Sequence, residues 1–174
     1  MTKKEIIAEL RSNYALFGDL ITSLNEDDFS YSPEGKWNAG QQLDHLIRAV
    51  SPLSIGLRLP KFLVRALYGK ANRPSKSFDE LVKKYKSKLE GGGRARGKFI
   101  PGKIQFYNKK KNIKGLLAKI EQLVKNIDSY SERQLDTFIL PHPLLGKVTL
   151  REMMYFTIYH AEHHRKQTIS NAGK

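Results

Sequence analysis

Apolar residues recur at intervals of three and four along much of the chain, which is the pattern of helices that bury one face. Four segments carry it most clearly, and we predict long helices over residues 2–24, 38–52, 113–127 and 149–170. Pro52 is expected to kink or end the second of these. Three of the helices should begin with a capping box, in which two side chains three positions apart satisfy free backbone N–H groups: Thr2 with Glu5, Asn38 with Gln41, and Thr149 with Glu152.

The segments between these helices carry weaker patterns. Residues 25–37 and 141–146 are predicted to be loops, while further helix is expected between 57 and 67 and a short helix over 77–89. Three glycines at 91–93 should stop that short helix, and a basic loop of about fifteen residues should follow, with a few extended residues possible near 99–106. We find no internal repeat and no convincing strand pair. The pattern therefore predicts an all-α four-helix bundle with extra short helices and a basic loop insert, formed by one domain over residues 1–174.

Composition supports a globular protein. The chain has 174 residues, of which 40% are hydrophobic, so it is long enough for a proper core. It lacks both an uninterrupted apolar run of membrane-spanning length and the apolar stretch of a signal peptide, and we expect a cytoplasmic protein. There is no cysteine, which excludes disulfides, thiol nucleophiles and thiolate metal ligands. A bound metal would therefore need imidazole and oxygen ligands.

Positive charge is concentrated in one segment. The formal net charge is +14, and residues 83–114 hold twelve lysines or arginines against one acid, Glu90. The rest of the chain is close to balanced. Runs of like charge usually form solvated faces, but a basic segment with interleaved aromatic residues is also compatible with an anionic partner.

Histidines supply the best candidate chemistry. His160 and His164 are four residues apart in the last predicted helix, so both rings project from one face and can reach a single ion at roughly 2.0–2.1 Å. On a helical wheel His163 should point elsewhere. Such a pair alone is a weak signal, because an ordinary hydrogen-bonded pair of histidines has the same spacing. His45, in the second helix, is a candidate third ligand, although the sequence alone does not bring it next to the other two.

Residues 37–46, together with His160-x-x-x-His164-x-x-Gln167 and the segment 141–152, resemble the DinB-like (DinB/YfiT) family of proposed metalloenzymes. The resemblance runs from the first helix to the last. It implies an up–down–down–up bundle with His45, His160 and His164 as metal ligands, and it implies a homodimer because relatives often pair. The basic insert at 91–111 and the long region 52–77 depart from the family pattern, which puts the substrate pocket in doubt more than the ligands.

Three neutral imidazoles would leave coordination positions open, as in a catalytic site. The ion, for which we favour zinc or nickel, could lower the pKa of a bound water to about 7. It could instead hold a thiolate nucleophile, which is what the resemblance implies, because characterised relatives include enzymes that use a low-molecular-weight thiol. We therefore predict a metal-dependent hydrolase or thiol-dependent transferase acting on a small molecule, with no identifiable catalytic side chain.

Several other residues are candidates for supporting roles. Gln167, His163 and His142 are possible partners of the metal ligands, and Trp37 is a possible pocket residue. Each also has a plainer interpretation: a surface residue for Gln167 and His163, turn structure for His142 and packing for Trp37. A rival hypothesis is a non-catalytic binding or interaction protein that uses the basic segment 83–114 for an anionic partner. We consider nucleic acid an improbable partner, because the chain contains no recognised DNA-reading motif.

Overall fold

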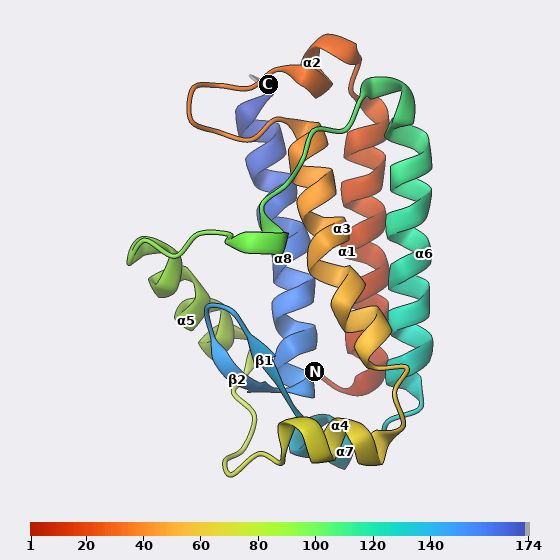
Figure 1. Cartoon of the computed structure of the whole chain (residues 1–174), viewed down its shortest axis with the longest axis vertical. Coiled ribbons are helices and arrows are strands. Elements are labelled where there is room, and N and C mark those ends of the chain that lie inside the picture. Colours follow the sequence, from red (N-terminus) through yellow and green to blue (C-terminus); the bar gives the residue numbers. More distant parts are fainter. Residues whose placement is uncertain (173–174) are drawn as a thin grey trace.

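The computed structural model describes residues 1–172, and four long helices form its body (Figure 1). They are α1 (Lys3–Ser23), α3 (Ala39–Gly56), α6 (Lys109–Asp128) and α8 (Leu150–Asn171). Helices α1 and α8 run in one direction and α3 and α6 in the other, which gives the up–down–down–up arrangement (Figure 1). Around the bundle, α1 contacts α6 and α8, and α3 contacts the same two helices. The predicted all-α bundle is confirmed.

The helix starts follow from the capping residues. Complete capping boxes are present at Thr2, Asn38 and Thr149, where each side chain accepts a hydrogen bond from the backbone N–H three residues on. Two boundaries differ from the prediction. Helix α3 continues through Pro52 to Gly56, and α6 begins at Lys109 instead of residue 113. Residues Lys109–Asn112 are all polar, so the spacing of apolar residues gives no sign of this first turn of α6.

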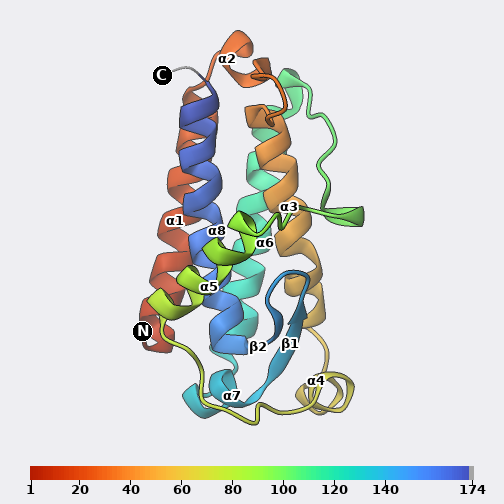
Figure 2. The same ribbon diagram turned by 90° about the vertical axis from the view of Figure 1, so that its left-hand side faces the viewer.

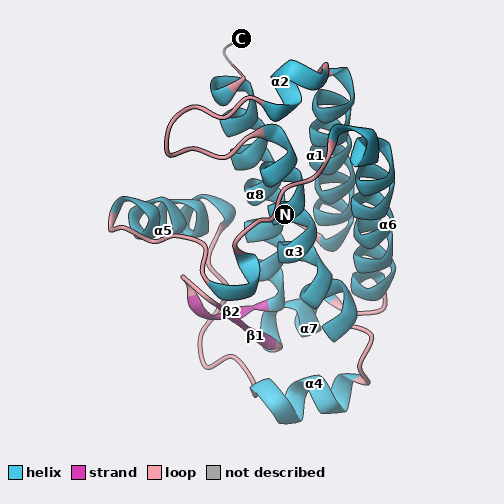
Figure 3. Ribbon diagram, turned by 45° about the horizontal axis from the view of Figure 1, so that its top comes forward, coloured by secondary structure: helices cyan, strands magenta, loops and turns pink. Residues whose placement is uncertain are grey.

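The shorter elements occupy the connections. They are α2 (Glu26–Ser30), α4 (Lys61–Tyr68), α5 (Phe78–Glu90), α7 (Glu132–Thr137) and the 3₁₀ turns η1 (Gly97–Phe99) and η2 (Phe106–Asn108). Helices α4 and α5 lie outside the four long helices (Figure 3). The predicted loop at 25–37 was partly wrong, because α2 lies within it; Asn25 caps this single turn by accepting from the N–H of Asp28.

A small hairpin contradicts the expectation that no strands pair. Strands β1 (Ile139–His142) and β2 (Gly146–Thr149) are antiparallel, with Ile139 opposite Thr149 and His142 opposite Gly146. Gly146 has a φ of +76°, which favours glycine at the turn. Each strand has four residues and β1 contains a proline, so the hairpin is too short to show an alternating pattern in the sequence.

The long connection between α3 and α6 passes along one side of the bundle. It runs from the foot of the bundle through α4 and α5 and returns past the middle of α3 before reaching the top of α6 (Figures 1 and 2). Helix α5 packs on α8 and η1 contacts α3. The crossover therefore covers one side of the α3–α8 pair instead of leaving it exposed to solvent.

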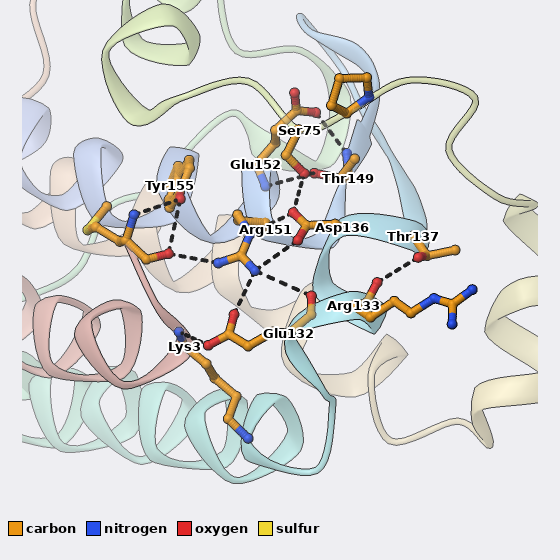
Figure 4. A network of polar contacts seen from close by, with 12 residues as sticks. Lys3, Ser75, Glu132, Arg133, Asp136, Thr137, Thr149, Arg151, Glu152 and Tyr155 are labelled. Atoms are coloured by element: carbon orange, nitrogen blue, oxygen red, sulfur yellow. Dashed lines mark hydrogen bonds and ion pairs between the residues drawn. The ribbon is translucent and has the colours of Figure 1, made fainter.

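A polar network fixes the foot of α8 (Figure 4). The Arg151 guanidinium donates to the carboxylates of Asp136 and Glu132 and to the carbonyl of Met1. The fully buried Glu152 accepts from both Nη atoms of Arg73 and from backbone N–H groups. These bonds connect the N-terminus, the crossover and α7 to the first turn of α8, and so hold the helix that carries two of the candidate ligands.

Within residues 1–172, none of the helices combines the length and apolar character that crossing a membrane requires.

Candidate metal centre

Two antiparallel helices bring the three predicted ligands together. His160 and His164 lie one turn apart on α8 and point toward α3, which supplies His45. All three side chains are buried, at 3%, 4% and 7% exposure respectively. Among the described residues they form a group whose possible ligand atoms all lie within 4.8 Å of one another.

The Nε2 atoms of the three rings face the same point. Nε2 of His160 lies 3.1 Å from Nε2 of His45 and 2.9 Å from Nε2 of His164. Two nitrogens bound at 2.0–2.1 Å to a tetrahedral ion would stand about 3.3 Å apart. Both separations from His160 are therefore only a few tenths of an ångström shorter than coordination of one ion requires.

Hydrogen bonds at the Nδ1 atoms of His45 and His164 determine which nitrogen of each ring carries the proton. Nδ1 of His45 donates to the backbone carbonyl of Phe99 over 2.7 Å, and Nδ1 of His164 donates to Oε1 of Gln42. Because both acceptors are oxygens without a proton, each Nδ1 carries the hydrogen. In the neutral rings of His45 and His164, Nε2 is then a bare lone pair directed at His160.

This arrangement is unfavourable without a cation. Nε2 of a neutral His160 carries at most one proton, which can be directed at only one of its two neighbours. At least one close pair of lone pairs therefore remains unbridged in a buried site. A divalent ion at the point of convergence would accept all three lone pairs at once, so the residues present fit a tri-histidine metal site.

Burial keeps the cluster neutral. Desolvation lowers the pKa of all three histidines, and for His160 and His164 it is reinforced by repulsion from the neighbouring imidazoles. For His45 the hydrogen bond to Phe99 and the charge of Asp44 act in the opposite direction but are smaller than the effect of burial. Neutral imidazole is the form that binds metal, so protons compete with an ion only under acidic conditions.

The three histidines lie in the wall of a large cleft. The cleft has a volume of about 1460 Å³ and is lined by α3, α8, the β1–β2 hairpin, α5 and the segment between α5 and η1. Trp37 is part of its wall, with its ring centroid 5.0 Å from that of His45 and 6.2 Å from that of His164. A small molecule in the cleft would reach the open side of the cluster.

The other predicted supporting residues also line this cleft, but in different roles. Gln167 interacts with His164 and partly offsets the lowering of its pKa. His163 does not join the three Nε2 atoms; its ring lies 5.1 Å from that of His164 and 6.3 Å from that of Tyr85. The helical wheel directed His163 away from the bundle, but α5 packs on that side of α8 and encloses it.

His142 stabilises the hairpin turn. Its Nδ1 accepts hydrogen bonds from the backbone N–H groups of Leu144 and Leu145, both at 3.1 Å, so this nitrogen is not available to a metal. Burial and the nearby Lys84 lower the pKa of His142 to about 4. The ring packs against Phe156, 4.1 Å between centroids.

The three acidic residues of α3 and α8 already have other partners. Asp44 accepts from Arg48 and from the N–H of Gly102, Glu162 pairs with Lys166, and Glu152 belongs to the network at the foot of α8.

Sequence reasoning missed the two residues that orient the ligands. Gln42 precedes His45 by three positions and so lies on the same face of α3, a spacing that could have singled it out. The Phe99 carbonyl gives no signal in the sequence, because it is a backbone group that only the path of the crossover brings to His45.

The fold and the site define a class of protein: an up–down–down–up helical bundle with three converging histidines between two of its helices. The family model of the DinB superfamily matches residues 9–168, nearly the whole chain, and the protein belongs to this superfamily. The buried histidine cluster and this membership are together compatible with a metal site. A search of curated proteins found no match.

Proposed function

We propose that His45, His160 and His164 bind one divalent metal ion and that the protein is a metal-dependent enzyme acting on a small molecule in the adjoining cleft. The observation that carries this proposal is the convergence of three Nε2 lone pairs, two of them fixed by hydrogen bonds at Nδ1, in the wall of a cleft. Zinc and nickel suit an all-imidazole set best.

The protein's own residues have distinct roles in this proposal. Gln42 and the Phe99 carbonyl hold two of the rings in the ligating tautomer, and Trp37 covers the cluster from the side. The bound ion would supply Lewis acidity toward a carbonyl oxygen or a thiolate. Since the carboxylates of Asp44, Glu152 and Glu162 already have partners, we favour reactions that need no separate protein base: hydrolysis, or transfer to a low-molecular-weight thiol.

Metal analysis tests the site. Protein purified after growth with added zinc or nickel should contain about one ion per chain, and His45→Ala, His160→Ala and His164→Ala should each lose most of it. His163→Ala and His142→Ala are matched controls in the same cleft and should keep the ion. Wild-type protein that binds neither metal at a stoichiometric level would overturn the proposal.

Whether the reaction requires an added thiol distinguishes the two reaction classes. Metal-loaded protein would be assayed against a panel of small esters and electrophiles with and without an added thiol such as glutathione. A rate that depends on the thiol favours a transferase, and an unchanged rate favours a hydrolase. A homodimer and a cytoplasmic location complete the proposal, and sedimentation analysis would test the first of these.

A further inference from the structure

The cleft beside the histidines has two chemically different ends. Toward the foot of the bundle its wall is apolar, formed by Leu53 from α3, Leu57 just after this helix, Met153 from α8 and Leu140 from the hairpin. At the level of the histidines and above, the wall contains positive charge. This second group contains Lys36, Arg94, Arg96 and Lys98, of which the last three belong to the basic segment 83–114, and also Lys166, which is paired with Glu162.

The path of the crossover explains where these cations lie. The carbonyl of Phe99 accepts from His45, and the carbonyl of Lys98 accepts from Arg48 one turn further along α3. These two bonds fix η1 beside the candidate metal centre. Arg94 and Arg96, just before η1, and Lys98 within it therefore line the cleft together with the histidines.

Apart from Lys166, these cations are not neutralised by acids within residues 1–172. Arg94 donates to the carbonyls of Leu89 and Gly93, and Lys98 lies over the ring of Phe99 at 5.4 Å. Within residues 1–172, no ion pair forms between an acid and Lys36, Arg94, Arg96 or Lys98. The one acid in the lining is the exposed Glu90. A cleft with low-dielectric walls and an excess of one charge concentrates ligands of the opposite charge.

The other cations of the basic segment lie outside the lining of this cleft. Lys84 donates to the carbonyl of Leu145, and the buried Lys109 donates to the carbonyls of Thr22 and Leu24 at the end of α1. These two lysines therefore stabilise the fold and do not contact the cleft. This favours a small anion inside the cleft over a polyanion that follows a continuous strip of charge.

We propose that the ligand of this cleft is an amphiphilic organic anion, with a carboxylate or phosphate head held by Arg96 and Lys98 beside the histidines and an apolar body directed toward Leu53 and Leu140. As a substrate class this rests on the proposed function. The binding preference itself comes from the wall of the cleft and is measurable without metal.

Trp37 provides the readout. It is the only tryptophan in the chain and it lines the cleft, so its fluorescence reports locally on a bound molecule. The probes are four molecules with the same alkyl chain: octanoate, octyl phosphate, octanol and octylammonium. We expect at least one of the two anions to bind about tenfold or more tighter than octanol, and octylammonium to bind most weakly. The stronger of the two anions identifies the head group. Butanoate should bind at least about tenfold more weakly than octanoate, because less apolar surface is buried.

Two double variants test whether Arg96 and Lys98 cause the preference for anions. The double variant Arg96→Ala with Lys98→Ala should lower the affinity for the anion about tenfold and leave the affinity for octanol unchanged, since both side chains are exposed and their removal should not disturb the fold. The matched control is Arg58→Ala with Arg65→Ala, which removes two exposed cations outside the cleft and should change neither affinity.

The same titration on His160→Ala distinguishes this inference from the proposed function. Preference for the anion that persists in this variant, whatever the metal analysis gives, supports the inference independently of the metal. Equal affinities for the anions and octanol, tighter binding of octylammonium, or no fluorescence change with any probe would overturn it. Those results would leave a metal-binding wild-type protein, and with it the proposed function, intact.

Discussion

The hydrogen bond from His164 to Gln42 gives the sharpest prediction about the candidate metal centre. Replacing Gln42 by leucine keeps a similar volume at a position that is 1% exposed, but removes the acceptor of the Nδ1 proton. The ring of His164 is then free to rotate or to move its proton to Nε2, which is the nitrogen that faces His160. One of three ligands loses its fixed orientation.

Loss of a partner that orients a metal-bound histidine typically lowers metal affinity about 10–100-fold, which corresponds to about 1.4–2.7 kcal/mol. We expect this loss for Gln42→Leu with zinc, measured by competition with a chromophoric chelator. Gln42→Glu retains an acceptor and should stay within about threefold of wild type or bind more tightly, because a carboxylate raises the basicity of the ring. The matched control Gln122→Leu removes an amide that bonds to Asn126 on α6, outside the cleft, and should leave the affinity unchanged.

Thermal unfolding without metal separates this effect from a damaged fold. Gln42→Leu leaves a buried N–H unsatisfied and should lower the free energy of unfolding by about 1–3 kcal/mol even in a chelator. If Gln42→Leu binds zinc as tightly as wild type, the bond to His164 does not orient a ligand, and the reasoning from tautomers is refuted.

Three further predictions concern stability. Zinc at about 100 times its dissociation constant should stabilise wild type by about 2.7 kcal/mol in calorimetry, whereas His160→Ala should show little shift. Burial raises the pKa of Glu152, but hydrogen bonds from Arg73 and two backbone N–H groups lower it by more, so the net pKa lies below its usual value. The ionised carboxylate therefore stabilises the fold above the pKa of the unfolded chain, and this stabilisation is lost as pH falls through the folded pKa. Urea titrations of Glu152→Gln should accordingly show a weaker pH dependence than wild type below about pH 4.5. Gly40→Ala would place Cβ 3.0 Å from the ring of Phe29 and should lower the free energy of unfolding, measured in urea, by about 1–3 kcal/mol. Gly115→Ala, in open space on α6, should raise it by about 0.5–1 kcal/mol. Equal effects of the two substitutions would contradict this packing argument.

Local signals account for the parts of the fold that the sequence predicted well. Capping boxes and apolar stripes act within one turn or one face of a helix, so Thr2, Asn38 and Thr149 mark helix starts wherever the helices later pack. The same locality explains the two failures. The hairpin at 139–149 depends on pairing between two strands of four residues each, and α2 is one turn marked only by the cap at Asn25 and an acidic first turn, without an apolar stripe.

For the candidate site, too, local sequence signals account for one part and tertiary packing for the rest. The sequence by itself determined that His160 and His164 share one helix face, because the helical repeat places residues four apart one above the other. Only the tertiary structure decided that His45 meets them, that Gln42 and the Phe99 carbonyl orient two of the rings, and that part of the basic segment lines the cleft. These contacts join residues that are 54 to 122 positions apart, and they depend on how α3 packs on α8 and where the crossover runs, which no local pattern encodes.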